Sequence, residues 1–179
     1  SNNYQRLLLA GSTSVANGTL LGAAEVMRND GPWQTPENLK KENFLLHYSQ
    51  GDKKNGWSLL ASHYQADWDA TDQIAKRAID TGLVDRFGNL DDSTGGKTRR
   101  STLAFNQVMS NNNQQTRLSA YAVDYRLNLF SNFTYYLTDP VRGDHFEQAD
   151  RRQIYGGRIE HSLFSNWYGH DVTNTLGAS

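Results

Sequence analysis

The chain has 179 residues, a formal net charge of −1, 37% hydrophobic residues, 21% charged residues and no cysteine. The near-neutral charge gives no basic footprint for nucleic acid, and the lack of cysteine excludes a disulfide scaffold and a thiolate metal site. No apolar run approaches the roughly 18 residues of a transmembrane helix, which leaves a soluble domain or membrane strands as the classes to separate.

Alternation of apolar and polar residues predicts about eight β-strands, because a period of two places alternate side chains on opposite faces. In chain order, the first four are expected at 4–14, 18–28, 43–50 and 56–65. The next four are expected at 102–109, 117–137, 155–163 and 167–176. Most of these segments are near the 9 to 11 residues that cross a bilayer when a strand is tilted.

The clearest alternation runs from Arg117 to Leu137, about 20 residues, which is far longer than the usual strand. One face of this segment carries Tyr125, Leu127 and Leu129. The other face carries Asp124, Arg126, Asn128 and Asn132. We expect the first face to meet lipid and the second to face the lumen of a barrel, where polar side chains are tolerated.

The connections between these strands alternate in length. Short turns are expected at 14–18, 51–56, 110–114 and near 164–166, and long loops at 29–42, 66–97 and 138–152. Outer-membrane barrels sort their connections in this way, with tight periplasmic turns and extended external loops. A soluble sandwich has no reason to do so.

The longest loop is expected to contain one short helix. Thr71 or Asp72 can cap its start, Ile74 and Ala78 share a face, and Gly82 fits the position just after its end. An ordered loop of about thirty residues is uncommon and usually functional.

Three stretches together resemble the C-terminal barrel of proteobacterial TonB-dependent receptors. They run from Gly31 to Asp52, from Asn55 to Asp91 and from Leu127 to Arg152, and they cover most of the chain. The resemblance implies an all-β fold: about eight antiparallel strands of a larger transmembrane barrel, spanning residues 1–179. No plug domain or TonB-contacting box is recognised, so the chain is expected to be a part of a receptor.

The resemblance further implies a non-enzymatic transport protein of the bacterial outer membrane, which takes up a nutrient such as a siderophore. The implied partners are outer-membrane lipid, the rest of the barrel, the plug, the TonB complex acting through the plug, and the small nutrient ligand. No cofactor is expected. The candidates for ligand-facing loop positions are Trp33, Asp67, Trp68, Asp69, Asp72 and His145.

Other chemistry in the sequence is better explained by structure. Asp67, Asp69 and Asp72 lack the spacing of an EF-hand, and the histidines lack an i, i+4 pair, so no metal site is predicted. Aromatic residues near the predicted strand ends favour a membrane-interface girdle over a sugar-binding platform, because they are spread over many strands. These residues are Trp57, Tyr64, Tyr121, Tyr135, Tyr136, Tyr155 and Trp167.

Two alternatives remain open. A complete eight-stranded outer-membrane barrel fits the chain length and requires the first and last strands to pair. A secreted, soluble β-sandwich that binds carbohydrate would bury one face of each strand, and the face with Asp124 and Arg126 would then leave charges unsatisfied in the core.

Overall fold

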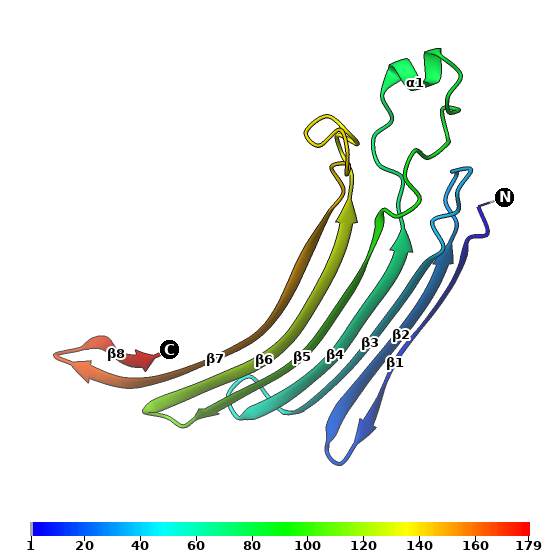
Figure 1. Cartoon of the computed structure of the whole chain (residues 1–179). Helices are drawn as coiled ribbons and strands as arrows, with labels where there is room; N and C mark the ends of the chain where they lie inside the picture. The colour runs from blue at the N-terminus through cyan, green and yellow to red at the C-terminus, as the bar shows by residue number, and fades with distance from the viewer. Residues whose placement is uncertain (1) are drawn as a thin grey trace.

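The computed structural model describes residues 2–179, which form one open sheet of eight antiparallel strands in sequential order (Figure 1). The strands are β1 (Gln5–Val15), β2 (Gly18–Asn29), β3 (Leu39–Gly51), β4 (Gly56–Asp69), β5 (Gly95–Ser110), β6 (Gln114–Ser131), β7 (Phe146–Trp167) and β8 (His170–Ala178). The one helix in the described residues, α1 (Lys76–Asp80), lies between β4 and β5. The predicted all-β, antiparallel class is confirmed.

The connections are sorted by length between the two ends of the sheet (Figure 1). Tight turns join β1 to β2, β3 to β4, β5 to β6 and β7 to β8 at one end. Three long loops lie at the other end, and we name them the first loop (30–38), the second loop (70–94) and the third loop (132–145). The predicted alternation of short and long connections is confirmed.

Two of the tight turns have two residues, both with positive φ. They are Ala16–Asn17, between the paired residues Val15 and Gly18, and Tyr168–Gly169, between Trp167 and His170. Positive φ at both central residues matches the right-handed twist of a hairpin. The last turn therefore lies beyond residues 164–166, where the sequence had placed it, and β7 continues through that segment.

Strand β6 ends at Ser131, although the alternation predicted a strand to Leu137. The chain turns at Tyr135, which has φ 58°, and the Leu137 amide donates to the Thr134 carbonyl at 3.1 Å. Residues 133, 135 and 137 are apolar and continue the period of two, but the backbone of this segment forms a turn and not a strand. The predicted strand end is wrong, and Asn132 belongs to the third loop.

Helix α1 is present, but its predicted start is wrong. Ala75 occupies the N-cap with no side-chain cap, whereas Thr71 and Asp72 lie several residues earlier. The expected end is confirmed, since Gly82 has φ 72° and its amide donates to the Ile79 carbonyl at 3.0 Å. Asp72 instead accepts a hydrogen bond from the third loop, so a contact between loops replaced the local capping role.

The sheet is a single layer with almost no core. The accessible surface of the described chain is 12779 Å², whereas a compact 20.2 kDa protein exposes roughly 8,800 Å². Only Ala66, Ala78 and Val123 are buried hydrophobic residues among those described. No second layer covers the sheet and β1 does not pair with β8 in residues 2–179, so the sandwich and the closed eight-stranded barrel are not the architecture of this chain.

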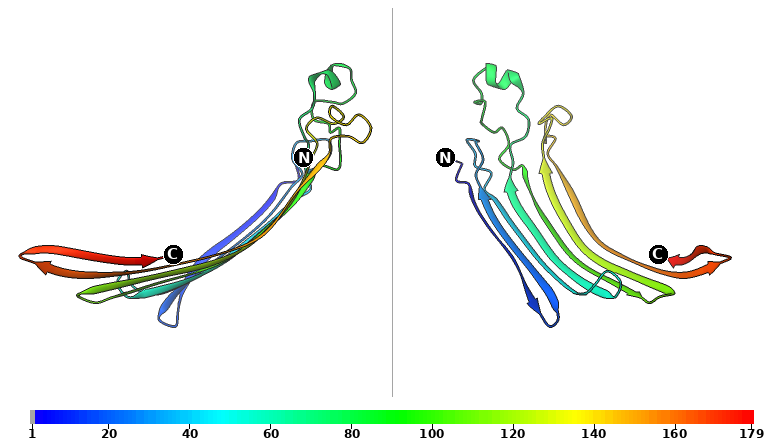
Figure 2. Two further views of the ribbon diagram at one scale, coloured as in Figure 1. Left: turned by 60° about the vertical axis from the view of Figure 1, so that its left-hand side comes forward. Right: turned by 180° about the vertical axis from the view of Figure 1, so that it is seen from behind.

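The sheet is sheared and bent. Successive pairs connect Val15, at the end of β1, to Ile159 in β7, yet β7 runs on to Trp167 before it turns. Counted along the paired strands, each tight turn therefore lies further from the long loops than the turn before it. This is the stagger that the tilted strands of a barrel require. The strands also bend along their length, as the side view in Figure 2 shows.

Candidate functional site

Strand pairing assigns every strand residue to one of two sides of the sheet, because directly opposed residues point the same way. Leu46 lies opposite Gly22 and Ala61, and the next pairs along lead to Leu103, Ala122 and Tyr155. We call the side that carries these residues the belt side. The side that carries Leu45, Val123 and their neighbours is the opposite side.

A continuous apolar surface crosses the belt side, and we call it the belt. It consists of Leu7 and Leu9 on β1, Leu20 and Val26 on β2, Phe44 and Leu46 on β3, Leu59 on β4, Leu103 and Phe105 on β5, Leu118 on β6, and Tyr155 and Ile159 on β7. No Asp, Glu, Lys or Arg belongs to the belt, and Glu42, which lies opposite Val26 on the same side, borders it toward the loops. Leu9 is 63% exposed and Leu46 and Leu103 are each 51% exposed, so the belt is an uncovered surface.

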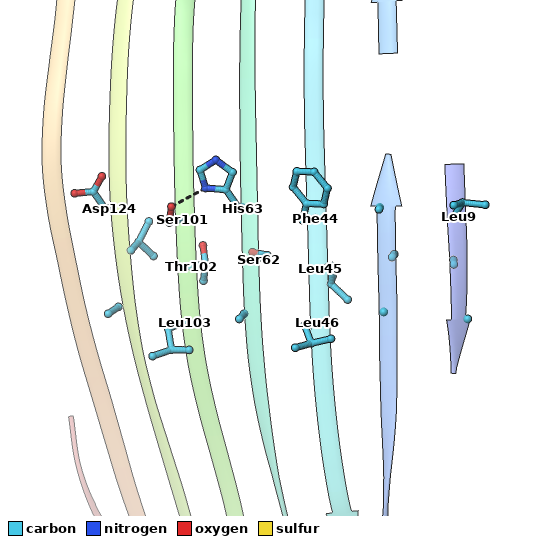
Figure 3. Close-up of a pocket in the computed structure, with 18 of the residues that line it drawn as sticks. Leu9, Phe44, Leu45, Leu46, Ser62, His63, Ser101, Thr102, Leu103 and Asp124 are labelled. Carbon is cyan, nitrogen blue, oxygen red and sulfur yellow. Dashed lines mark hydrogen bonds between the residues drawn. The ribbon is translucent and has the colours of Figure 1, made fainter. Parts of the chain in front are cut away.

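An open depression of about 950 Å³ lies on the belt side. Figure 3 shows the residues that line it on neighbouring strands, with the 2.9 Å hydrogen bond between His63 and Ser101 toward the loop end. Small residues, Gly11, Gly22 and Ala61 among them, line its floor and leave the space between the larger side chains open. The depression follows from sheet shape and small side chains, and no set of polar groups converges in it as in a ligand pocket.

The opposite side mixes polar and apolar residues at the same height. Serine, threonine and asparagine alternate there with apolar residues, and ion pairs lie directly on the strands. The Glu25 carboxylate, with its side chain 11% exposed, contacts Arg6 Nε at 2.6 Å and Lys41 Nζ at 3.1 Å. Arg158 and Glu160 form a further pair at 2.6 Å. A wetted or protein-covered environment suits this side, whereas lipid does not.

Three of the residues predicted to face a lumen, Asp124, Arg126 and Asn128, share one side of β6 as expected. Pairing places this side next to Ser101, Arg99 and Lys97, directly between the belt and the loops. They therefore lie on the belt side, above its apolar part. Tyr125, Leu127 and Leu129, predicted to meet lipid, lie on the opposite side.

The aromatic residues divide between the two sides. On the belt side, near the tight turns, the Trp57 ring lies 5.1 Å from Tyr48 and 6.3 Å from Phe105. Tyr155 and Trp167 are also on the belt side, whereas Tyr64 and Tyr121 are on the opposite side. The row formed by Tyr48, Trp57 and Phe105 borders the belt, as an interfacial girdle does.

The first loop packs on the second loop. The Gln34 amide donates to the Phe87 carbonyl at 2.8 Å, and its side chain donates to Asp85 at 2.7 Å. Trp33 stacks 6.1 Å from Phe87 and donates from Nε1 to Glu37 at 2.5 Å. The predicted ligand candidate Trp33 is therefore part of the contact between two loops.

The third loop packs on the second loop through Asn132, which is 5% exposed. Its backbone amide donates to Asp72 Oδ2 at 2.7 Å, and its side-chain amide donates to Asp91 Oδ2 at 2.6 Å. Its side-chain oxygen accepts from the Tyr135 amide at 2.9 Å. Burial raises the pKa of Asp91, but hydrogen bonds from Asn132 and Ser93 outweigh it, so the pKa is lowered overall.

The remaining acidic candidates do not form a cluster. Asp67 pairs with Lys97 at 3.1 Å, and Asp69 accepts from Asn38 at 2.8 Å. Trp68, between them, lies on the opposite side of the sheet. No group of three metal-ligating side chains comes together in residues 2–179.

His145, the last candidate, lies at the base of the third loop and stacks on Phe130 with ring centroids 5.8 Å apart. Among the predicted positions, the structure thus brings together Asp72 with Asn132, and Asp124 with Arg126. The contacts between the loops are completed by Asp91, Phe87 and Tyr135. Local sequence patterns do not predict these contacts, because the partners are far apart along the chain.

Acid is expected to release the third loop. Asp144 accepts from Thr134 Oγ1 at 2.5 Å and from the amides of Thr138 and Asp139 at 2.9 and 2.7 Å, and these bonds lower its pKa from 3.8 to about 2. A depressed folded-state pKa stabilises the folded loop above pH 3.8 and loses that contribution as the pH falls to about 2. The protection of the amides at 134–144, taken relative to their intrinsic exchange rates, should fall over this range. Asp144→Asn should show low protection at every pH, and protection equal to that of the unchanged chain would contradict this role.

No family profile, curated protein or solved structure matches the chain. No helix among the described residues has the length and apolar character needed to cross a bilayer.

Proposed function

We propose that this chain is part of the wall of a bacterial outer-membrane β-barrel of the TonB-dependent receptor type. The observation that carries the proposal is the belt, a charge-free apolar surface that crosses seven neighbouring strands of an open, sheared meander. Lipid is the natural environment for such a surface, and the tilted strands are long enough to cross a bilayer.

In this proposal the belt side meets lipid and the opposite side faces the lumen. This orientation reverses the one expected from β6 alone, because it places Tyr125 and Leu127 toward the lumen. The belt-side residues of β6 at bilayer height are Leu118, Ala120 and Ala122, which are all apolar, and the two alanines are small. Asp124, Arg126 and Asn128 then lie above the hydrocarbon, on the outer surface near the loops.

The three long loops would form the external surface of the receptor. Contacts of the second loop with both neighbours support one ordered cluster, and external loops of this kind contribute to capture of a small nutrient such as a siderophore. The remainder of the barrel, the plug and the TonB complex would be the partners in uptake. The proposed role of the chain is transport, without catalysis.

The isolated chain should require detergent or lipid. Its belt, together with the unpaired edges of β1, of β8 and of the part of β7 that β8 does not cover, would associate with other copies in plain buffer. Analytical ultracentrifugation should show large aggregates without detergent and a uniform, strand-rich species in neutral micelles. A monodisperse monomer in plain buffer would contradict the proposal.

A further inference from the structure

Three arginines stand side by side on the belt side, just above the belt. Arg99 on β5 lies directly opposite Arg126 on β6, and Arg126 lies directly opposite Arg151 on β7. We call them the arginine row. Like charges at opposed positions of a sheet destabilise it unless an anion compensates them.

The protein supplies only part of that compensation. Asp124 Oδ1 lies 3.8 Å from Arg99 Nη2 and 3.5 Å from Arg126 Nε, so one carboxylate serves two guanidinium groups at long distance. The Nε atom of Arg126 is buried and makes no hydrogen bond. Among residues 2–179, Arg151 forms no ion pair, whereas its neighbour Arg152 pairs with Asp150.

A concave site lies beside the row. A depression of about 230 Å³ is lined on the belt side by Lys97, Arg99, Arg126 and Asn128, with Gln65 and Asp67 at its edge. Asp67 contacts Lys97 at 3.1 Å and forms no ion pair with the arginines, so the two arginines share only the carboxylate of Asp124. Guanidinium groups with free N–H donors and a lysine beside them form a setting that suits a phosphate group.

The position of the arginine row relative to the belt indicates which kind of phosphate-bearing molecule would bind there. Following each strand toward the tight turns, the belt begins within two alternate positions of the row, at Leu103 after Arg99 and at Tyr155 after Arg151. If the belt lies in the hydrocarbon, as the proposed function requires, the row and the depression lie at the level of lipid headgroups. Basic groups at this level attract anionic lipids.

We propose that Arg99, Arg126 and Arg151, with Lys97, bind the phosphate monoester of a membrane lipid on the outer surface of the barrel wall. A monoester carries up to two negative charges and three free acceptor oxygens, which matches the unpaired donors of the row. Its acyl chains would lie along the belt. This inference rests on the proposed function, because it needs the belt to be immersed in lipid.

The test measures the dissociation constant of the full chain for short-chain phosphatidic acid in neutral micelles by calorimetry. The double variant Arg99→Gln/Arg126→Gln should bind at least about tenfold more weakly, because it loses charge-assisted hydrogen bonds to the phosphate. Arg100→Gln/Arg152→Gln is the matched control, since each residue adjoins a row member in sequence but points to the opposite side. The control should keep the wild-type constant, and equal weakening in both would overturn the site.

Three further measurements complete the test. Arg151→Gln alone, at an exposed position, should weaken binding several-fold even if the double variant fails to fold. Inorganic phosphate should bind far more weakly than phosphatidic acid, and equal affinity would show a free-phosphate site. Insertion into phosphatidylcholine vesicles is scored separately: normal insertion without any preference for phosphatidic acid overturns only the lipid site, whereas failed insertion overturns the proposed function.

Discussion

Leu46→Arg should prevent the chain from assembling in lipid vesicles, whereas Leu45→Arg should assemble nearly as well as the unchanged chain. The two leucines are neighbours on β3, but Leu46 belongs to the belt and Leu45 to the opposite side. An arginine on the lipid face near the bilayer midplane costs about 2 to 4 kcal/mol, and lumen positions tolerate charge because water or the plug meets them.

The pair is well matched, since residue type, strand and height are the same and both leucines are flanked by small residues. Leu46 lies between Gly22 and Ala61, and Leu45 lies between Ala23 and Ser62. Folded yield can be measured by protease protection after refolding into vesicles. An equal loss of folded yield from both variants would show that the two sides of β3 do not face lipid and lumen. A greater loss of folded yield from Leu45→Arg would show that the opposite side, and not the belt side, faces lipid.

Asn132→Ala should release the third loop from the second. The substitution leaves Asp91 without one of its donors and the Tyr135 amide without its acceptor. Loss of hydrogen bonds to a charged or buried partner costs about 1 to 3 kcal/mol, and here the cost applies to loop order, because no strand pairing depends on these bonds.

Hydrogen–deuterium exchange should therefore increase in residues 70–94 and 132–145 and remain unchanged in the paired strands. The control is Asn112→Ala, an exposed asparagine in the tight turn between β5 and β6 at the other end of the sheet. Unchanged exchange in the Asn132 variant would mean that the loops are ordered independently of each other.

The fold class, the strand order and the sorting of connections were predictable from local signals, because alternation and turn residues act over a few neighbouring positions. The N-cap of α1 was not, since the side chain of Asp72 finds its partner in Asn132, far along the chain. The end of β6 was missed for a related reason. Apolar residues at 133, 135 and 137 kept the period, but the turn at Tyr135 is stabilised by the packed loops.

The proposed orientation of β6 is the reverse of the orientation that the sequence of this strand predicts. Read alone, β6 is most apolar on the side of Tyr125, Leu127 and Leu129, and a single strand offers no other criterion. Only the register with β3 and β5 places Ala120 and Ala122 in line with Leu46 and Leu103. A lipid-facing surface is thus formed by several neighbouring strands together. The sequence of one strand alone does not show that its small residues belong to such a surface.

Site-directed spin labelling along β5 tests the central claim most directly, because the chain has no cysteine and single cysteines can be placed at will. Labels at residues 102 to 105 in vesicles would be probed with oxygen, which concentrates in hydrocarbon, and with a water-soluble nickel chelate. We expect high oxygen accessibility at Leu103 and Phe105, which belong to the belt, and low oxygen accessibility at Thr102 and Ala104. High oxygen accessibility at Thr102 and Ala104, or no alternation at all, would contradict it.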